Sequence, residues 1–216
     1  MPRTPPSRAP LTRERVLRAA LKLVDARGLE ELSMRKLAGE LGVEAMSLYN
    51  HVKGKDDLLG GILDLVAAEI EPPDEGLDWK SALRARSTAR YEAFVRRPWA
   101  ARIWMSKSVP GSVHIAQADG VLRRLREAGL SPLDVYRAYH VLDGYVLGYA
   151  LQHQEFAYTA KELKKLARDF LRELPREEYP DFALHVEQHL DRAFATHRSF
   201  EFGLDMILDG LDRLGE

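Results

Sequence analysis

The 216-residue sequence contains no cysteine. This absence excludes disulfide bonds, a thiolate sensor and a zinc–cysteine cluster. The sequence also lacks a run of about eighteen apolar residues, the minimum that a membrane-spanning helix requires. Its first ten residues, MPRTPPSRAP, have no apolar segment of the kind found in a signal peptide. We therefore expect a cytoplasmic protein with no membrane partner.

A strand pattern is absent too, because apolar residues recur at helical spacing and not in alternation. We predict an all-α protein. The segment EPPDEGLD, at 71–78, holds two prolines and a glycine and forms the clearest boundary within the chain. We expect a disordered arm over residues 1–10, a small three-helix domain with its connecting helix over 11–71, and a larger helical bundle over 78–216.

Charge is almost balanced overall, with a net value of −1, but it is unevenly distributed. Residues 1–55 hold 11 lysines and arginines against 6 acids, whereas the remaining residues hold 21 against 27. A basic N-terminal part beside an acidic body favours contact with phosphates through the N-terminal part. An excess of this size also occurs on ordinary protein surfaces, so by itself it does not indicate a nucleic-acid-binding protein.

The clearest motif is the segment LSMRKLAGELGVEAMSLYNHVKGKDDLL at 32–59. Ser33 is a good N-cap for a helix of about two turns. Gly42 follows the last apolar position of that helix, where a left-handed backbone closes it. A second short helix packs inward through Leu48, and Gly54 ends it before a third helix with an acidic first turn. The sequence therefore predicts a helix-turn-helix.

This layout, together with a preceding helix that Thr12 caps, resembles the DNA-binding domain of the TetR family of bacterial transcriptional regulators. The resemblance covers roughly residues 11–71. It implies a double-stranded DNA operator and a second copy of the chain as partners, a small-molecule effector, and repression. In TetR-like proteins the second short helix enters the major groove, and its positions here are Ala45, Met46, Ser47, Tyr49, Asn50 and His51. The resemblance places phosphate contacts at Ser33, Met34, Tyr49, His51 and Lys55.

Few of these side chains can read bases. Arg35 can contact guanine through two hydrogen bonds, and Asn50 can address adenine. Ala45 and Met46 offer only apolar contact to a thymine methyl group. The alternative for Tyr49 and for His51 is a core or capping role.

The C-terminal part supplies aromatic residues with polar tips, which suit the lining of an apolar ligand site. The candidates are Tyr91, Phe94, Trp99, Trp104, Met105, Tyr136, Tyr139, His140 and Asp143. Each aromatic residue is by itself more typical of a core. Asp143 lies in an apolar run, so we expect it to pair with a ligand, with His140 or across a dimer interface, or else to be solvated at a groove.

Neither a cofactor nor a metal site is predicted. His185 and His189 lie one helical turn apart and can bind a metal in principle, but the sequence offers no third ligand near them. Tetracycline is not predicted as the effector.

The last helix and the long helix beginning at Pro132 are expected to form a dimer surface. The last helix has an apolar stripe, and two glycines four residues apart on the long helix allow close approach of a neighbour. In TetR-like proteins the corresponding helices pair with their copies in a four-helix bundle. The interface candidates are Gly144, Gly148, Phe200, Leu204, Ile207, Leu208 and Leu211. Alternatively, these stripes close a bundle within one chain.

Together these features predict a ligand-responsive repressor, released from a palindromic operator by a small-molecule effector. One alternative is a helical small-molecule-binding protein or enzyme whose N-terminal helices only pack. Another is a nonspecific nucleoid protein, which the modest basic excess disfavours. The sequence shows no Ser/His/Asp or metal constellation, so we do not expect an enzyme.

Overall fold

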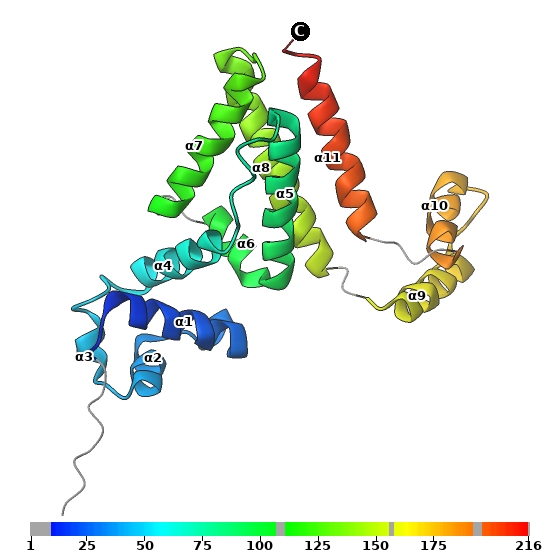
Figure 1. The fold of residues 1–216 in the computed structure, drawn as a ribbon. Coiled ribbons are helices and arrows are strands. Elements are labelled where there is room, and N and C mark those ends of the chain that lie inside the picture. The colour runs from blue at the N-terminus through cyan, green and yellow to red at the C-terminus, as the bar shows by residue number, and fades with distance from the viewer. Residues whose placement is uncertain (1–9, 107–110, 156–157, 192–195, 216) are drawn as a thin grey trace, which may run out of the picture.

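A computed structural model describes residues 10–106, 111–155, 158–191 and 196–215. The described residues form helices and no strand, which confirms the all-α prediction (Figure 1). The elements are α1 (Arg13–Arg27), the 3-10 helix η1 (Leu29–Glu31), α2 (Met34–Leu41), α3 (Ala45–Leu48), α4 (Lys55–Ala68), α5 (Trp79–Arg96), α6 (Pro98–Ser106), α7 (Ser112–Glu127), α8 (Pro132–Glu155), α9 (Ala160–Glu173), α10 (Pro180–Asp191) and α11 (Thr196–Asp212). The expected N-terminal arm lies outside the described residues, apart from Pro10.

Helices α1 to α4 surround a small core of their own. Its fully buried side chains include Val16, Ala20, Leu37, Leu48, Leu58 and Ile62. The Thr12 hydroxyl accepts a hydrogen bond from the Arg15 N–H at 3.2 Å, as expected of an N-cap. Helices α1 and α4 approach closely at Gly61, where a Cβ would lie 2.4 Å from a terminal carbon of Leu17. A glycine at this crossing lets the two helices pack without displacing Leu17.

A second core lies among α5, α6, α7, α8 and α11. At its centre the rings of Tyr91 and Phe200 stack with centroids 4.0 Å apart, and both residues are buried. Helix α4 contributes Leu63, Val66 and Ala67 to this core, in addition to the residues that it gives to the first. Helix α4 is therefore shared between the two cores.

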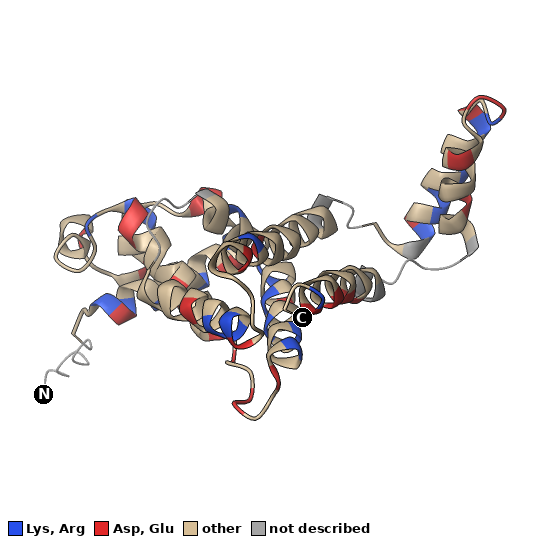
Figure 2. Ribbon diagram, turned by 90° about the horizontal axis from the view of Figure 1, so that it is seen from above, with Lys and Arg blue, Asp and Glu red and all other residues tan. Residues whose placement is uncertain are grey.

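Helices α9 and α10 form a hairpin that stands apart from the rest of the molecule (Figures 1 and 2). They pack on each other around a small core of Ala167, Leu171, Ala183 and Val186. The capping box of Thr159 and Glu162 begins α9. Lysine or arginine residues and acidic residues both occur along this hairpin (Figure 2). No helix among the described residues is long and apolar enough to cross a bilayer.

Arg13 joins the start of α1 to the turn before α4. Its two terminal nitrogens donate to the Asp57 carboxylate at 2.8 and 2.6 Å, and one of them also donates to the His51 carbonyl at 2.9 Å. The Lys53 N–H donates to the same carboxylate at 2.8 Å. The hydrogen bond from Arg13 is the main reason that the pKa of Asp57 is lowered to about 2.

This pair predicts a pH-dependent contribution to stability. Because the pKa of Asp57 is lower in the folded chain than its ordinary value, the stabilisation is present above pH ~4 and is lost as the pH falls towards 2. Arg13→Gln should raise the pKa of Asp57 towards its ordinary value and lower the free energy of unfolding at pH 7 by at most about 1 kcal/mol. An NMR titration of the carboxyl carbon measures the first effect and thermal unfolding the second.

Arg18→Gln is the matched control, because Arg18 forms an exposed pair with Glu14 on the same helix. It should leave the titration of Asp57 unchanged. An Asp57 carboxyl that titrates near pH 4 in the unaltered protein would contradict the prediction.

Candidate nucleic-acid interface and ligand cavity

The turn between α2 and α3 has the predicted geometry. The Ser33 hydroxyl accepts from the Lys36 N–H at 3.2 Å and caps α2. Gly42 has φ 66° and ψ 38°, a left-handed conformation that penalises a side chain. The Val43 N–H then donates to the Ala38 carbonyl at 3.0 Å. Helix α2 therefore ends just before Gly42, and α3 begins three residues after this glycine, at Ala45.

Helix α3 is shorter than the sequence indicated. It spans only Ala45–Leu48, and Tyr49–His51 lie in the turn that follows it. The prediction that these three residues belong to the second helix is therefore wrong. After Leu48 the hydrogen bonds shorten from the α-helical spacing: the Tyr49 N–H donates to the Met46 carbonyl at 3.2 Å and the His51 N–H to the Leu48 carbonyl at 2.9 Å, each three residues back. The α-helix therefore gives way to a tighter turn, after which Val52, 2% exposed, enters the core.

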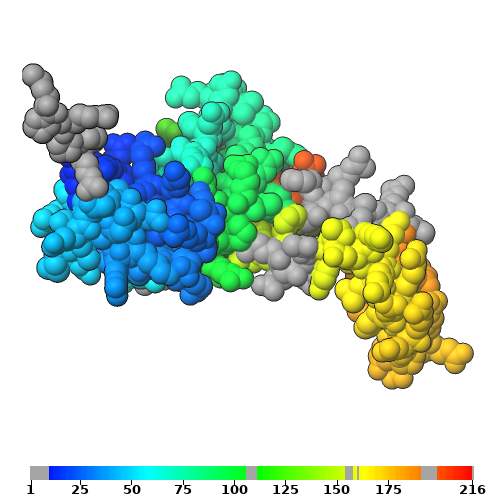
Figure 3. All heavy atoms as spheres, turned by 90° about the horizontal axis from the view of Figure 1, so that it is seen from below, coloured from blue at the N-terminus to red at the C-terminus, as the bar shows by residue number. Residues whose placement is uncertain are grey.

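The residues expected to face DNA, which we together call the reading face, are all exposed or half-buried. Met46 is 72% exposed and Tyr49 is 49% exposed. Ser33, Arg35, Asn50 and Lys55 are exposed, and Met34, Ala45, Ser47 and His51 are half-buried. Leu48 and Val52 fill the inward positions, so the core alternative for Tyr49 does not hold. The N-terminal helices form one end of the molecule, and the α9–α10 hairpin forms the other (Figure 3).

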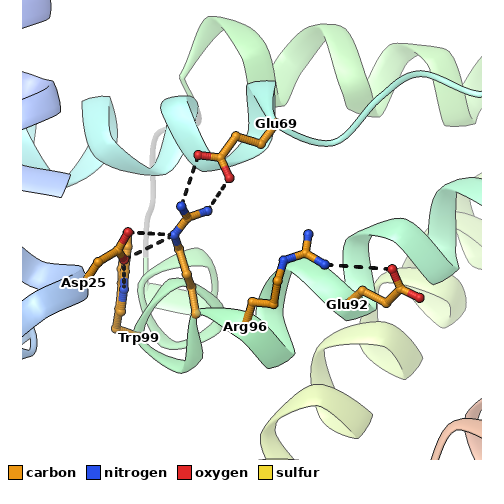
Figure 4. Close-up of polar contacts among 6 residues, drawn as sticks. Asp25, Glu69, Glu92, Arg96 and Trp99 are labelled. Atoms are coloured by element: carbon orange, nitrogen blue, oxygen red, sulfur yellow. Dashed lines mark hydrogen bonds and ion pairs between the residues drawn. The ribbon is translucent and has the colours of Figure 1, made fainter. Parts of the chain in front are cut away.

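Arg97, directly after α5, links the N-terminal helices to the rest of the chain. Its Nε donates to the Asp25 carboxylate on α1 at 3.0 Å, and its terminal nitrogens pair with Glu69 at the end of α4. The Trp99 indole N–H donates to Asp25 at 3.1 Å (Figure 4). The carboxylate of Glu69 is the main reason that the pKa of Arg97 is raised. Trp99, a predicted effector residue, thus takes part in a junction between α1, α4 and α6.

The structure contains a cavity that suits a small ligand better than this junction does. A cleft of about 970 Å³ lies at the junction, and three of its charged residues, Asp25, Glu69 and Arg97, already pair with one another. A cavity of about 560 Å³ lies instead between the end of α4, the linker, α5 and α7. Its wall is mixed: apolar side chains predominate, and its polar residues are Glu75, Arg86, Ser112, Gln117, Arg123 and Arg124. Such a lining is typical of small-molecule sites.

A smaller enclosed space adjoins this cavity and shares Leu83, Arg86 and Val121 with it. Two of the predicted effector residues, Tyr139 and Asp143, line the smaller space. Three others, Tyr91, Phe94 and Trp104, are buried in the surrounding core. Met105, Tyr136 and His140 are exposed and line neither space, so the structure does not bring them to this site.

Asp143 is paired, but not with any of the partners expected from the sequence. Its carboxylate accepts a hydrogen bond from Arg90 on α5, within the same chain. The guanidinium carbon of Arg90 lies 4.5 Å from the centroid of the Trp104 ring, which in turn stacks on His114 at 3.9 Å. Burial lowers the pKa of His114, so its imidazole is neutral at pH 7. Arg90 is thus held between a carboxylate and an aromatic face.

Four polar residues near the cavity were missed by the sequence reasoning: Arg86, Arg90, His114 and Gln117. A signal for two of them was present. Arg86 and Arg90 lie three and seven residues after the buried Leu83, on the stripe of α5 that the pattern assigns to the core. Charged residues on a buried stripe indicate a polar site inside the bundle.

Two polar contacts join this cavity to α4. The Asp64 carboxylate accepts the backbone N–H groups of Val113 and His114 and so caps the start of α7. Gln117, one turn further along α7, donates from Nε2 to the Ala67 carbonyl at 2.6 Å. Burial raises the pKa of Asp64. Helix α7 is both a wall of the cavity and a direct contact of the helix that supports the reading face.

The expected dimer stripe of α11 needs correction. Phe200, Leu204 and Leu208 are at most 1% exposed, and Leu211 is 7% exposed, because all four face the core of their own chain. Ile207 is half-buried against the same core. The prediction that these side chains meet a second copy is therefore wrong for the four buried residues, and the intramolecular alternative describes them.

A different apolar strip of α11 is exposed. Phe202 is 68% and Met206 60% exposed, and they flank Gly203, where Tyr145 of α8 packs. Gly144 and Gly148 are exposed on α8 beside this contact, with open space where a Cβ would stand. The two helices therefore present an accessible strip at which a neighbour can approach closely.

Among the described residues no three histidine or acidic side chains are grouped to hold a metal ion. The rings of His185 and His189 lie 5.4 Å apart on α10 without such a third ligand.

A helix-turn-helix connected through a shared helix to a bundle with an internal cavity is the architecture of a transcriptional regulator. The chain belongs to the TetR family. Residues 16–62 match the family of bacterial regulatory proteins, tetR family, and residues 71–214 match the tetracyclin repressor-like C-terminal domain. Because this family comprises regulators, the enzyme alternative is not supported.

Individual relatives agree with this assignment. The HTH-type transcriptional repressor DrrR1 of Streptomyces coeruleorubidus is 37% identical over 97% of this chain and 81% of its own length. The tetracycline repressor protein class D of Escherichia coli is 30% identical over 86% of this chain and 90% of its own. The structure of the Streptomyces coelicolor TetR family protein ActR in complex with actinorhodin is similar with a TM-score of 0.82 and 30% identity, covering 96% of this chain and 100% of that one.

The reading face predicts different roles for two of its cations. Arg35→Ala should weaken binding to the preferred DNA sequence by roughly 1–3 kcal/mol and relax the preference at one base pair, because a base contact is lost. Lys55→Ala should lower the affinity for all sequences alike, because a phosphate contact carries no sequence information. Fluorescence anisotropy on preferred and random duplexes measures both. Equal losses on the two duplexes for Arg35→Ala would contradict its role as a base reader.

Proposed function

We propose that the protein is a ligand-responsive repressor that binds a palindromic DNA operator as a homodimer and leaves it when a small molecule binds. The observation that carries this proposal is the reading face, an exposed set of polar and aromatic side chains around a capped helix-turn-helix. Membership of the TetR family and similarity to a named repressor support it. We assign residues 11–71 to DNA binding and 78–216 to effector binding and dimerisation.

The DNA contacts follow from the chemistry of the reading face. Tyr49, His51 and Lys55 can donate to phosphate oxygens, and they lie near the start of α4 in the chain, where the positive end of the helix dipole also favours anions. Arg35 and Asn50 can address base edges. The basic excess of the N-terminal part draws this end of the molecule towards DNA.

The cavity between α4, α5 and α7 is the proposed effector site. A relative of similar fold is described in complex with actinorhodin, which supports a ligand site in the helical part of this chain. Effector and DNA must favour different conformations, with a coupling free energy of about 1–3 kcal/mol. The contacts of Asp64 and Gln117 provide the path, because a ligand that shifts α7 also pulls on α4.

The exposed strip of α8 and α11 is the proposed dimer surface. In a twofold dimer the two reading faces lie about one turn of DNA apart, roughly 34 Å, and this spacing requires a palindromic operator. Gly144 and Gly148 let the backbones approach, and Phe202 and Met206 supply apolar area.

Selection from random-sequence DNA at two salt concentrations tests the function. We expect an enriched palindrome whose half-sites lie about one helical turn apart. Raising the salt concentration should weaken binding to random DNA steeply, because phosphate contacts dominate nonspecific binding. The ratio of the affinities for the palindrome and for random DNA should change less. Enrichment of no sequence would favour a nonspecific binder, and enrichment of a single half-site would contradict the dimer.

Gly148→Arg tests the dimer surface directly. A large cation at an open position of α8 should yield particles with the mass of one chain and weaken binding to the palindrome at least about tenfold, because two half-sites are no longer read together. Analytical ultracentrifugation and anisotropy measure the two effects. Ala85→Arg adds the same side chain to an exposed position of α5 and should change neither. A dimer that persists in Gly148→Arg would place the interface elsewhere.

A further inference from the structure

Arg86 is the least explained charge in the molecule. It lies on α5 between the two adjoining spaces and lines both of them. None of the described residues forms an ion pair or a hydrogen bond with it. Burial, together with the nearby Arg90, lowers the pKa of Arg86 to about 10, so the guanidinium is charged at neutral pH.

Arg86 is half-buried, so its guanidinium loses part of its hydration without gaining an anionic partner among the described residues, which is unfavourable. The neighbouring carboxylate does not relieve this cost, since Asp143 already accepts from Arg90. His114 is neutral and adds no negative charge. Around the wider cavity lie Arg123 and Arg124, with Glu75 as an acid on the same wall; Arg124 pairs with Glu127, whereas no partner of Arg123 is found among the described residues. The cavity thus presents an excess of positive charge to whatever enters it.

Gln117 supplies a second unsatisfied group on the same wall. Its Nε2 is engaged with the Ala67 carbonyl, whereas its Oε1 is buried and has no partner among the described residues. A buried acceptor of this kind calls for a donor such as a hydroxyl group.

We propose that the effector is an apolar molecule with an acidic group, such as a carboxylate or sulfonate, that pairs with Arg86. A hydroxyl group on the same molecule would donate to the Oε1 of Gln117. This inference rests on the proposed function, because it takes the cavity as the effector site. It adds the chemical class of the ligand and identifies Arg86 as the residue that selects it.

The test compares matched probes that differ only in the acidic group. The first pair is 8-anilinonaphthalene-1-sulfonate and the uncharged N-phenyl-1-naphthylamine, measured by fluorescence titration. The second is 2-naphthoic acid and 2-naphthamide, measured by calorimetry. In the unaltered protein the anionic member of each pair should bind more tightly. Arg86→Met should weaken the anionic members about tenfold or more and leave the uncharged members unchanged or slightly tighter.

Three further variants serve as controls. Arg126→Met removes the same charge from an exposed position of α7 that lines neither space, and it should change no affinity. Arg86→Lys retains the charge without the planar fork, so it should keep part of the preference for the anions. Arg86→Gln repeats the test with a polar side chain if Arg86→Met unfolds, which thermal melting shows.

Two results would overturn the inference. One is an unaltered protein that binds the anionic members no more tightly than the uncharged ones, or binds neither. The other is an Arg86→Met variant that weakens both members of a pair equally. Neither of these measurements uses DNA. A wrong ligand class is therefore distinguishable from a wrong function, because the latter appears as the absence of an enriched palindrome in the DNA selection.

Discussion

The structure depends on α4 belonging to two cores at once. Its first half packs against α1 through Leu58 and Ile62, and its second half enters the helical bundle through Val66 and Ala67. Because interiors are close-packed, a displacement of α4 within the helical bundle also strains or moves its contacts with α1. The reading face and the cavity are therefore mechanically connected, although they lie in different parts of the molecule.

Polar contacts determine how this connection responds. Arg97 holds α4 and α1 together through Glu69 and Asp25, whereas Asp64 and Gln117 tie α4 to α7. These contacts are directional and lie along the second half of α4 and at its end. Such an arrangement fits a regulator, in which a ligand needs to bias two packings that differ by only a few kcal/mol.

The helix boundaries and the turn of the N-terminal part were predictable because their causes are local. A cap such as Ser33 and a left-handed glycine such as Gly42 act within one turn of chain. The length of α3 was not predictable in this way, since no cap or glycine follows Leu48 and the tighter turn at Tyr49–His51 leaves no signal in the sequence. The stripe of α11 shows the same limit. The apolar residues of α11 recur at helical spacing whether they face the core of their own chain or a second copy. Periodicity therefore does not tell which of the two surfaces covers them.

The sequence by itself determined the all-helical class and the family, because helical periodicity, caps and short motifs carry these features. Only the tertiary structure decided which acid neutralises which base. Asp143 and Arg90 are 53 residues apart in sequence and meet through the packing of α8 on α5. The same packing leaves Arg86 at the cavity wall without a partner among the described residues. Charge pairing inside a bundle depends on distances between helices, and no local pattern in the sequence encodes those distances.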